Sequence, residues 1–147
     1  MNSRTERILI IDADEQARND LSRYLEARGF YVTARGLFED KLPDVIFADL
    51  PADAIRDLTT RLADSESFIP VVTCTASNSS TDVIQALRAG AADVVLKPCN
   101  DDKGALDDVI GKLFDRVRVN RLNQLYRQEL EETNRELRSG IAELRAD

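Results

Sequence analysis

Five short apolar runs alternate with helical patterns along most of the chain. Residues 7–12 (RILIID) and 44–49 (DVIFAD) are continuous apolar runs that end in aspartate, as expected of central strands buried on both faces. Residues 69–75 and 93–97 follow the same pattern, and residues 30–34 form a shorter run that we expect to flank them. This alternation of strands and helices predicts a doubly wound α/β domain with a five-stranded parallel sheet.

Apolar residues at helical spacing predict helices between these strands. One covers residues 15–28 and ends at Gly29, and a second covers residues 54–63. A polar loop over residues 77–81 ends in a capping residue and opens a third helix, which ends at Gly90. The apolar residues that indicate this third helix are Val83, Ile84 and Leu87.

The connection between the second and third strands is short. Residues 35–43 leave room for about one helical turn, although a parallel crossover usually needs about a dozen residues. The helix at this place is therefore expected to be shortened or missing, which would leave one sheet face near the first and third strands under-covered. Leu37, Phe38 and Leu42 then either pack inward, the interpretation we favour, or form a patch for a partner.

A long C-terminal helix is predicted from residue 103 to the end, because this stretch contains no proline. Its first part can close the core of the domain, whereas the remainder is too long to pack on so small a domain. We therefore assign residues 1–118 to the domain and 119–147 to a helical extension. The residues expected to close the core are Leu106, Val109, Ile110, Leu113 and Val117.

The extension carries a short heptad pattern. Leucines recur at seven-residue intervals, with an asparagine and an isoleucine at the alternate core positions, which favours a parallel coiled-coil homodimer. Leu122, Tyr126 and Leu130 are instead spaced by four, a stutter that would locally unwind the supercoil. The alternative is a solvated helix with charged faces. The predicted dimer residues are Leu130, Asn134, Leu137, Ile141 and Leu144.

The amino-acid composition excludes several classes of functional site. The chain has no histidine and only two cysteines, Cys74 and Cys99, both expected to be buried thiols. A disulfide framework, a structural zinc site and Ser-His or Cys-His catalysis therefore lack their ingredients, and we expect no enzyme. A net charge of −7 disfavours direct binding to nucleic acid or membranes. Without a long apolar run or a signal peptide, the protein is expected to be cytoplasmic.

Polar side chains collect where the predicted strands end. Asp12 with Asp14, Asp49, Thr75 and Lys97 all follow or end strands, and ligands of open α/β sheets bind at this edge. Clustered carboxylates suit Mg²⁺, and a nearby hydroxyl and ammonium could hold a phosphoryl group.

These motifs resemble the receiver domains of two-component response regulators over about residues 7–113. The resemblance is carried by Ile-Leu-Ile-Ile-Asp ending at Asp12, by residues 43–50, by Thr75-Ala76, by Ala89-Gly90-Ala91 and by Lys97-Pro98. It implies a flavodoxin-like fold, Asp49 as phosphoacceptor, Thr75 and Lys97 as its phosphate-contacting partners, and Mg²⁺ as the metal. A histidine kinase or another signalling protein is the implied partner.

The chain departs from the family pattern at two positions of the site. Ala13 stands where receivers carry an acidic residue that binds Mg²⁺ directly, which should weaken metal binding by Asp12 and Asp49. Asp14 is an uncertain substitute for this ligand. Val94 replaces the usual aromatic switch residue. In a receiver that has lost its chemistry, Lys97 and Asp49 would form a structural salt bridge.

The sequence thus predicts a degenerate receiver, weakly phosphorylated or independent of phosphorylation, that acts as a dimerising signalling module. One alternative is a fully competent receiver that a histidine kinase phosphorylates at Asp49. Another is a scaffold that dimerises an enzymatic output domain, since the chain ends without a helix stop and looks truncated. The cognate kinase, the output domain and the pathway do not follow from the sequence.

Overall fold

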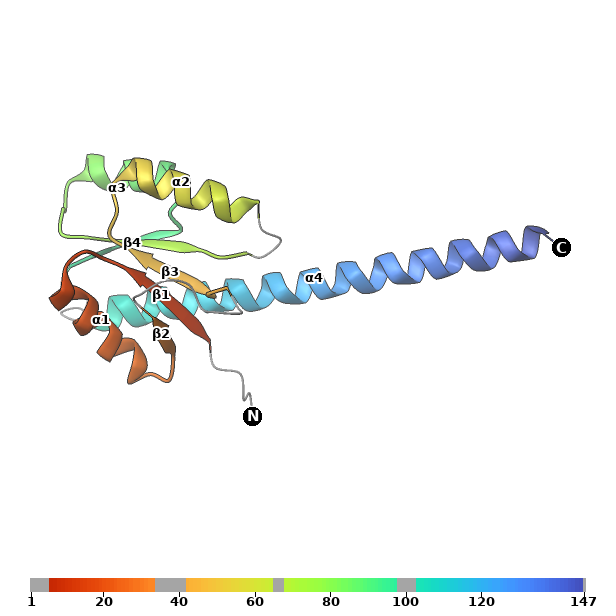
Figure 1. The fold of residues 1–147 in the computed structure, drawn as a ribbon, viewed down its shortest axis with the longest axis horizontal. Coiled ribbons are helices and arrows are strands. Elements are labelled where there is room, and N and C mark those ends of the chain that lie inside the picture. The colour runs from red at the N-terminus through yellow and green to blue at the C-terminus, as the bar shows by residue number, and fades with distance from the viewer. Residues whose placement is uncertain (1–5, 34–41, 65–67, 98–102, 147) are drawn as a thin grey trace. The chain divides into compact units, whose positions relative to one another are not determined.

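The computed structural model describes residues 6–33, 42–64, 68–97 and 103–146, with side chains over 104–141 in the last range. One parallel sheet has the strand order β2-β1-β3-β4-β5, and helices follow in the α/β pattern (Figure 1). This confirms the predicted fold class. The strands are β1 (Arg7–Ile11), β2 (Tyr31–Thr33), β3 (Val45–Ala48), β4 (Val71–Thr75) and β5 (Asp93–Leu96). The helices are α1 (Glu15–Glu26), α2 (Ala52–Ala63), α3 (Ser80–Arg88) and α4 (Lys103–Ala146).

Each strand is one or two residues shorter than its predicted range. Asp12 and Asp49 follow β1 and β3, and Lys97 follows β5. Before β4, Pro70 has no amide to donate, although its carbonyl accepts the Ile46 amide at 3.0 Å.

The sheet separates two hydrophobic layers. On one face, residues such as Ile8, Phe47 and Val72 pack with α1 and the first turns of α4. On the other face, residues such as Leu9 and Ile46 pack with α2 and α3. Figure 1 shows α2 and α3 on the opposite side of the sheet from α1 and the start of α4. The alternation of side chains along each strand therefore fills both layers.

Helix α3 packs differently from its predicted apolar face. Ile84 and Leu87 are each 46% exposed, and Ala86 is the residue that α3 buries. The small residues allow a close approach to α2: the Thr59 hydroxyl donates to the Ala89 carbonyl at 2.9 Å. A Cβ added at Gly90, whose φ is +113°, would lie 2.8 Å from the Thr59 hydroxyl oxygen. The helix begins at Ser80, with Ser79 as N-cap residue.

The first part of α4 closes the core as predicted. Leu106, Ile110, Leu113 and Val117 are buried, and Val109 is partly buried against them. Phe114, which the apolar spacing did not single out, also packs here, stacking on Phe30 with ring centroids 4.9 Å apart.

A polar clamp joins the same part of α4 to α1. The Arg28 guanidinium contacts the two Asp107 oxygens at 2.6 and 3.1 Å, and the Tyr24 hydroxyl donates to Asp107 at 2.6 Å. Arg28 also lies over the Tyr24 ring. The clamp thus adds partly exposed polar contacts to the apolar packing between this part of α4 and the domain.

The predicted short crossover falls on residues 34–41, which lie outside the described residues, as do Leu37 and Phe38. Leu9 and Ile46 are buried on the face that was expected to be under-covered, so that expectation is wrong at these two positions. Leu42 is exposed. Cys74 is a buried thiol in β4, as predicted, whereas Cys99 also lies outside the described residues.

The chain divides into two compact units, Met1–Val117 and Arg118–Asp147. The second unit consists of the helical turns of α4 that follow Val117, and its described apolar side chains are exposed: Val119, Leu122, Leu125, Tyr126, Leu130, Leu137 and Ile141. In the described part of the chain, no helix is both long enough and apolar enough to cross a membrane.

Truncation of a core residue in α4 tests how far the domain depends on this helix. Leu106 is fully buried, so Leu106→Ala should lower the free energy of unfolding by about 2 to 5 kcal/mol. Urea unfolding at one fixed protein concentration measures the change. Leu87→Ala is the same substitution at a half-exposed helical site and should cost well under half as much. Equal losses would contradict the assignment of α4 to the core.

Candidate functional site

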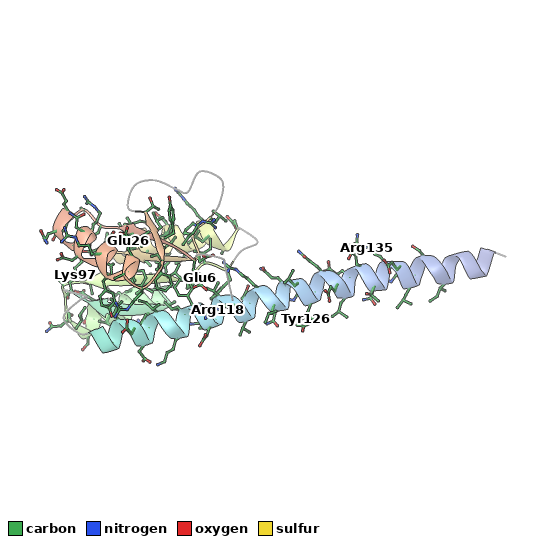
Figure 2. All side chains as sticks on the ribbon, turned by 90° about the horizontal axis from the view of Figure 1, so that it is seen from below. Glu6, Glu26, Lys97, Arg118, Tyr126 and Arg135 are labelled. Carbon is green, nitrogen blue, oxygen red and sulfur yellow. The ribbon has the colours of Figure 1, made fainter. Side chains whose placement is uncertain are left out.

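The register of the two central strands places two aspartates side by side. Ile11 of β1 pairs with Ala48 of β3, so Asp12 and Asp49 leave the sheet at the same level. The Asp49 amide donates to the Ile11 carbonyl at 2.8 Å, which holds the backbone of this edge. Figure 2 shows Lys97 at the end of the domain away from Glu6, which precedes β1. This edge therefore corresponds to the carboxyl ends of the strands, where ligands of open α/β sheets bind.

Lys97 bridges the two carboxylates. Its Nζ atom lies 2.5 Å from Asp12 Oδ2 and 2.5 Å from Asp49 Oδ2. The side chains of Asp12, Lys97 and Asp49 are 7%, 15% and 37% exposed, so Asp49 is the most accessible of the three. Three charges, two negative and one positive, are thus held in a partly desolvated site, where their interactions are stronger than in water. The structure brings together these three predicted residues.

The pKa of Lys97 reflects this environment. Burial disfavours the ammonium form, but the hydrogen bonds and charges of Asp12 and Asp49 outweigh burial and raise the pKa above its ordinary value of 10.5. Lys97 is therefore a permanent cation at any physiological pH, and it acts as the counter-ion of the site.

Asp12 is held by its surroundings as well as by Lys97. Its second carboxylate oxygen, Oδ1, accepts the Asp14 amide at 2.9 Å. Arg18 of α1 donates to the Asp12 backbone carbonyl at 2.7 Å. The sequence analysis missed Arg18, for which only its helical spacing from Asp14 gave a signal. Arg18 is a positioning residue, because it contacts the backbone at the site and not the carboxylate.

Asp14 caps α1. Its Oδ1 atom accepts the amides of Gln16 at 3.0 Å and of Ala17 at 3.4 Å, the usual N-cap arrangement. The Asp14 carboxylate is thereby engaged with the helix amides, whereas those of Asp12 and Asp49 are engaged with Lys97.

These residues do not fit a three-carboxylate metal site. Ala13 offers no side-chain oxygen, and both available carboxylates are paired with the ammonium of Lys97. Among the described residues, no group of three or more His, Cys, Asp or Glu side chains is arranged to hold a metal ion. Hard cations such as Mg²⁺ prefer several oxygen ligands at short distance, and among the described residues the carboxylates of Asp12 and Asp49 are already engaged by Lys97.

Thr75 lies at the same edge as the last residue of β4. Its backbone carbonyl accepts the Lys97 amide at 2.8 Å, and its hydroxyl accepts the Ser77 amide at 3.1 Å. Within the described residues, no acceptor takes the proton of this hydroxyl. Ser77 in turn donates to Asp82 of α3 at 2.6 Å, so this hydroxyl belongs to a network that reaches α3.

The position of the expected aromatic switch is filled by a small apolar side chain. Val94 pairs with Thr73 in the sheet and packs, partly buried, on the layer formed with α2 and α3. A valine has no ring to swing between an inward and an outward position.

Asp49 retains one carboxylate oxygen for chemistry. Oδ2 contacts Lys97, and Oδ1 makes no hydrogen bond or ion pair within the described part of the chain. A carboxylate, a hydroxyl and an ammonium at one sheet edge are groups that can take part in phosphoryl transfer.

Comparison with known proteins identifies the family. The family model of the response regulator receiver domain matches residues 8–109. The regulatory protein AtoC of Escherichia coli K12 is 35% identical over 107 residues, which cover 66% of this chain and 23% of that protein. A protein-glutamate methylesterase/protein-glutamine glutaminase of Rhodopseudomonas palustris is 31% identical over 125 residues, 76% of this chain and 34% of that protein. The chain therefore spans about a quarter to a third of these relatives.

The fold also has counterparts among solved structures. A two-component response regulator from Clostridium difficile superimposes with a TM-score of 0.63 and 22% identity, covering 76% of this chain and 98% of that one. This similarity concerns the fold alone, and the family model supplies the assignment. The chain belongs to the response regulator receiver domain family, whose members receive the signal in two-component systems.

Proposed function

We propose that the chain is a degenerate receiver in which the Lys97 ammonium, and not Mg²⁺, is the counter-ion that Asp12 and Asp49 share. The observation that carries the proposal is the double contact of Lys97 Nζ with both carboxylates, beside an alanine at the expected ligand position. Receiver domains typically bind Mg²⁺ at the phosphorylation site. In this chain a side chain of the protein, Lys97, partly neutralises the two carboxylates.

Electrostatics explain why this arrangement disfavours phosphorylation. Phosphoryl transfer spreads negative charge over the transferred group, and catalysis consists mainly of positioning and of cations that neutralise this charge. Two carboxylates and one ammonium leave the site with a net negative charge before a phosphodonor arrives. Lys97 would have to exchange its contact with Asp49 Oδ2 for one with a phosphoryl oxygen, and it would still share its charge with the Asp12 carboxylate.

We assign weak residual chemistry to the retained residues. Asp49 is the phosphoacceptor candidate, and Thr75 and Lys97 are its phosphate-contacting partners. Asp14 does not replace the missing metal ligand in this proposal, because leaving its capping position would uncover the amides of Gln16 and Ala17. The module has no enzymatic activity of its own and binds no nucleic acid. It interacts with a histidine kinase or a phosphotransfer protein, as receiver domains do.

The output of the module is a homodimer. We propose that residues 1–118 act as the receiver and 119–147 as a coiled-coil extension. The exposure of its apolar residues supports this division, since a solvated single helix gains nothing from them. The relatives are longer than the matched segment, and one of them is named as a methylesterase. The scaffold alternative uses the same coiled coil to dimerise such an output domain, but its receiver is not phosphorylated.

A competent receiver is the second candidate, and one observation favours it. Asp49 is 37% exposed and keeps Oδ1 available, so a small phosphodonor can reach it. In that case the missing acidic residue at position 13 would slow the reaction without preventing it.

Intact mass after incubation with acetyl phosphate and Mg²⁺ separates the two candidates. We expect little adduct on the wild type and a clear one-phosphate adduct on Ala13→Asp, because the variant restores a third carboxylate. Asp49→Asn in the Ala13→Asp background is the control and should remove the adduct. Full, Asp49-dependent phosphorylation of the wild type would contradict the degenerate receiver.

Removal of the Lys97 charge should destabilise the domain. In Lys97→Gln the largely buried Asp12 carboxylate keeps its charge without a counter-ion, so the free energy of unfolding at neutral pH should fall by about 1 to 3 kcal/mol. Because folding raises the pKa of Lys97 above 10.5, its contribution is fully present below that pH and is lost only at more alkaline pH. Urea unfolding of wild type and variant at pH 7 and 9 should therefore give the same difference. Arg61→Gln, an exposed charge removal on α2, serves as control, and an unchanged stability of Lys97→Gln would contradict the counter-ion role.

Acidic substitutions at the predicted heptad positions test the dimer. The double variant Leu130→Asp/Leu137→Asp should be monomeric by light scattering at concentrations where the wild type is a dimer, because four carboxylates would meet in the interface. Gln128→Asp/Ser139→Asp places the same charges on the other side of the helix and should leave the dimer intact. A wild type that stays monomeric at all concentrations would rule out the coiled coil.

A further inference from the structure

The exposed apolar residues of α4 beyond Val117 follow an eleven-residue repeat. Val119, Leu130 and Ile141 are spaced by eleven, and so are Tyr126 and Leu137. A third series of the same period contains Leu122, Thr133 and Leu144. Of the exposed large apolar residues in the described part of this segment, six belong to these series and Leu125 alone does not. We call the face formed by these three series the seam.

An eleven-residue repeat keeps the seam on one side of the helix. At about 100° per residue, its positions fall within a stripe about 100° wide along the whole segment. Figure 2 shows Tyr126, which belongs to the seam, and Arg135, which does not, projecting from opposite sides of α4. The four-residue spacings around Tyr126, which interrupt a heptad pattern, are regular parts of this longer repeat.

The flanks of the seam carry opposite charges. Arg127 and Arg138, also eleven residues apart, lie on one flank, and Glu129 and Glu136 lie on the other. All four side chains are exposed, and none forms an ion pair within the described part of the single chain. Two residues are exceptions: Arg118 lies on the acidic flank and Glu131 lies on the basic flank.

The opposite charges of the two flanks favour a partner helix in parallel orientation. In a parallel two-stranded coil with twofold symmetry, the basic flank of one helix faces the acidic flank of the other. In an antiparallel pair, by contrast, each flank faces its own copy, so that arginines would meet arginines and glutamates would meet glutamates. Complementary flanking charges set orientation and partner choice in coiled coils.

We propose that a second copy of this chain pairs with the seam in parallel and in register from Val119 to Ile141, with a slight right-handed supercoil. The proposal rests on the homodimer proposed above and specifies its geometry. An eleven-residue repeat gives about 3.67 residues per turn, which winds two helices in the right-handed sense.

A second copy suits this face better than an unrelated partner. Any partner helix must carry the same uncommon repeat over the same length, and an identical chain does so by construction. Residues 118–147 contain six arginines and six acidic residues, so two copies of this segment have no net charge to repel each other. Asn123 and Asn134, again eleven residues apart, lie beside the seam, where their amides can hydrogen-bond to their own copies.

The seam also begins directly after the receiver. Val117 is the last buried residue of the first unit, and Val119 is the first exposed residue of the seam. No unpatterned linker separates the two. The pairing therefore includes the Val119 to Tyr126 stretch, which a heptad seam confined to Leu130 and beyond would leave unpaired.

Disulfide formation between single cysteines tests register and orientation in the full chain. In a Cys99→Ser background, Val119→Cys and Ile141→Cys should each cross-link to their own copies on mild oxidation, because equivalent seam positions face each other in a parallel pair. Gln128→Cys and Ser139→Cys, on the far side of the helix, are the matched controls and should cross-link at least tenfold less. The readout is the fraction of dimer on a non-reducing gel.

The outcomes separate this inference from the dimer itself. A dimer by light scattering that cross-links Ile141→Cys but not Val119→Cys would overturn the continuous seam and leave the dimer in place. Cross-linking only between mixed Val119→Cys and Leu144→Cys chains would show an antiparallel pair and would also overturn the proposal. Absence of any dimer by light scattering would instead contradict the homodimer on which the proposal rests.

Discussion

Two carboxylates at the ends of neighbouring parallel strands cannot share a partly buried edge without a cation between them. The register of β1 and β3 forces Asp12 and Asp49 to the same level, and the end of β5 supplies Lys97 as the cation. In this chain the pairing is completed internally, since the neighbouring position is Ala13 and offers no further ligand. The arrangement of the site, and the limited room it leaves for Mg²⁺, both follow from this one triad.

The sequence predicted that Asp12, Asp49 and Lys97 lie together, because this prediction needs only the ends of the strands and the parallel topology of the sheet. Apolar runs that end in Asp12, Asp49 and Lys97 define parallel strands, and parallel strands bring their carboxyl ends to one edge. What the sequence did not predict depends on tertiary contacts. The burial of Ala86 in place of Ile84, for example, depends on how closely α3 approaches α2, which no single helical pattern encodes.

The roles of two polar residues near the site also depend on tertiary contacts that the sequence does not predict. Asp14 was a candidate ligand by its proximity in the sequence, but its carboxylate caps α1, and only the direction of the chain after Asp12 decides between these roles. Arg18 contacts the Asp12 carbonyl across one helical turn. For the C-terminal helix, the heptad pattern covers part of the exposed face, and the eleven-residue repeat also accounts for the exposed Val119 and Leu122.

The central claim is that Lys97 stands in for the metal, and Mg²⁺ titration followed by amide chemical shifts in NMR spectra tests it most directly. The account predicts that the amides of Asp12, Asp49 and Lys97 do not shift at millimolar Mg²⁺ in the wild type. It also predicts saturable shifts at these amides in Ala13→Asp. Saturable shifts of the same size in the wild type would contradict the account, because they would show that Mg²⁺ displaces the ammonium without a third carboxylate.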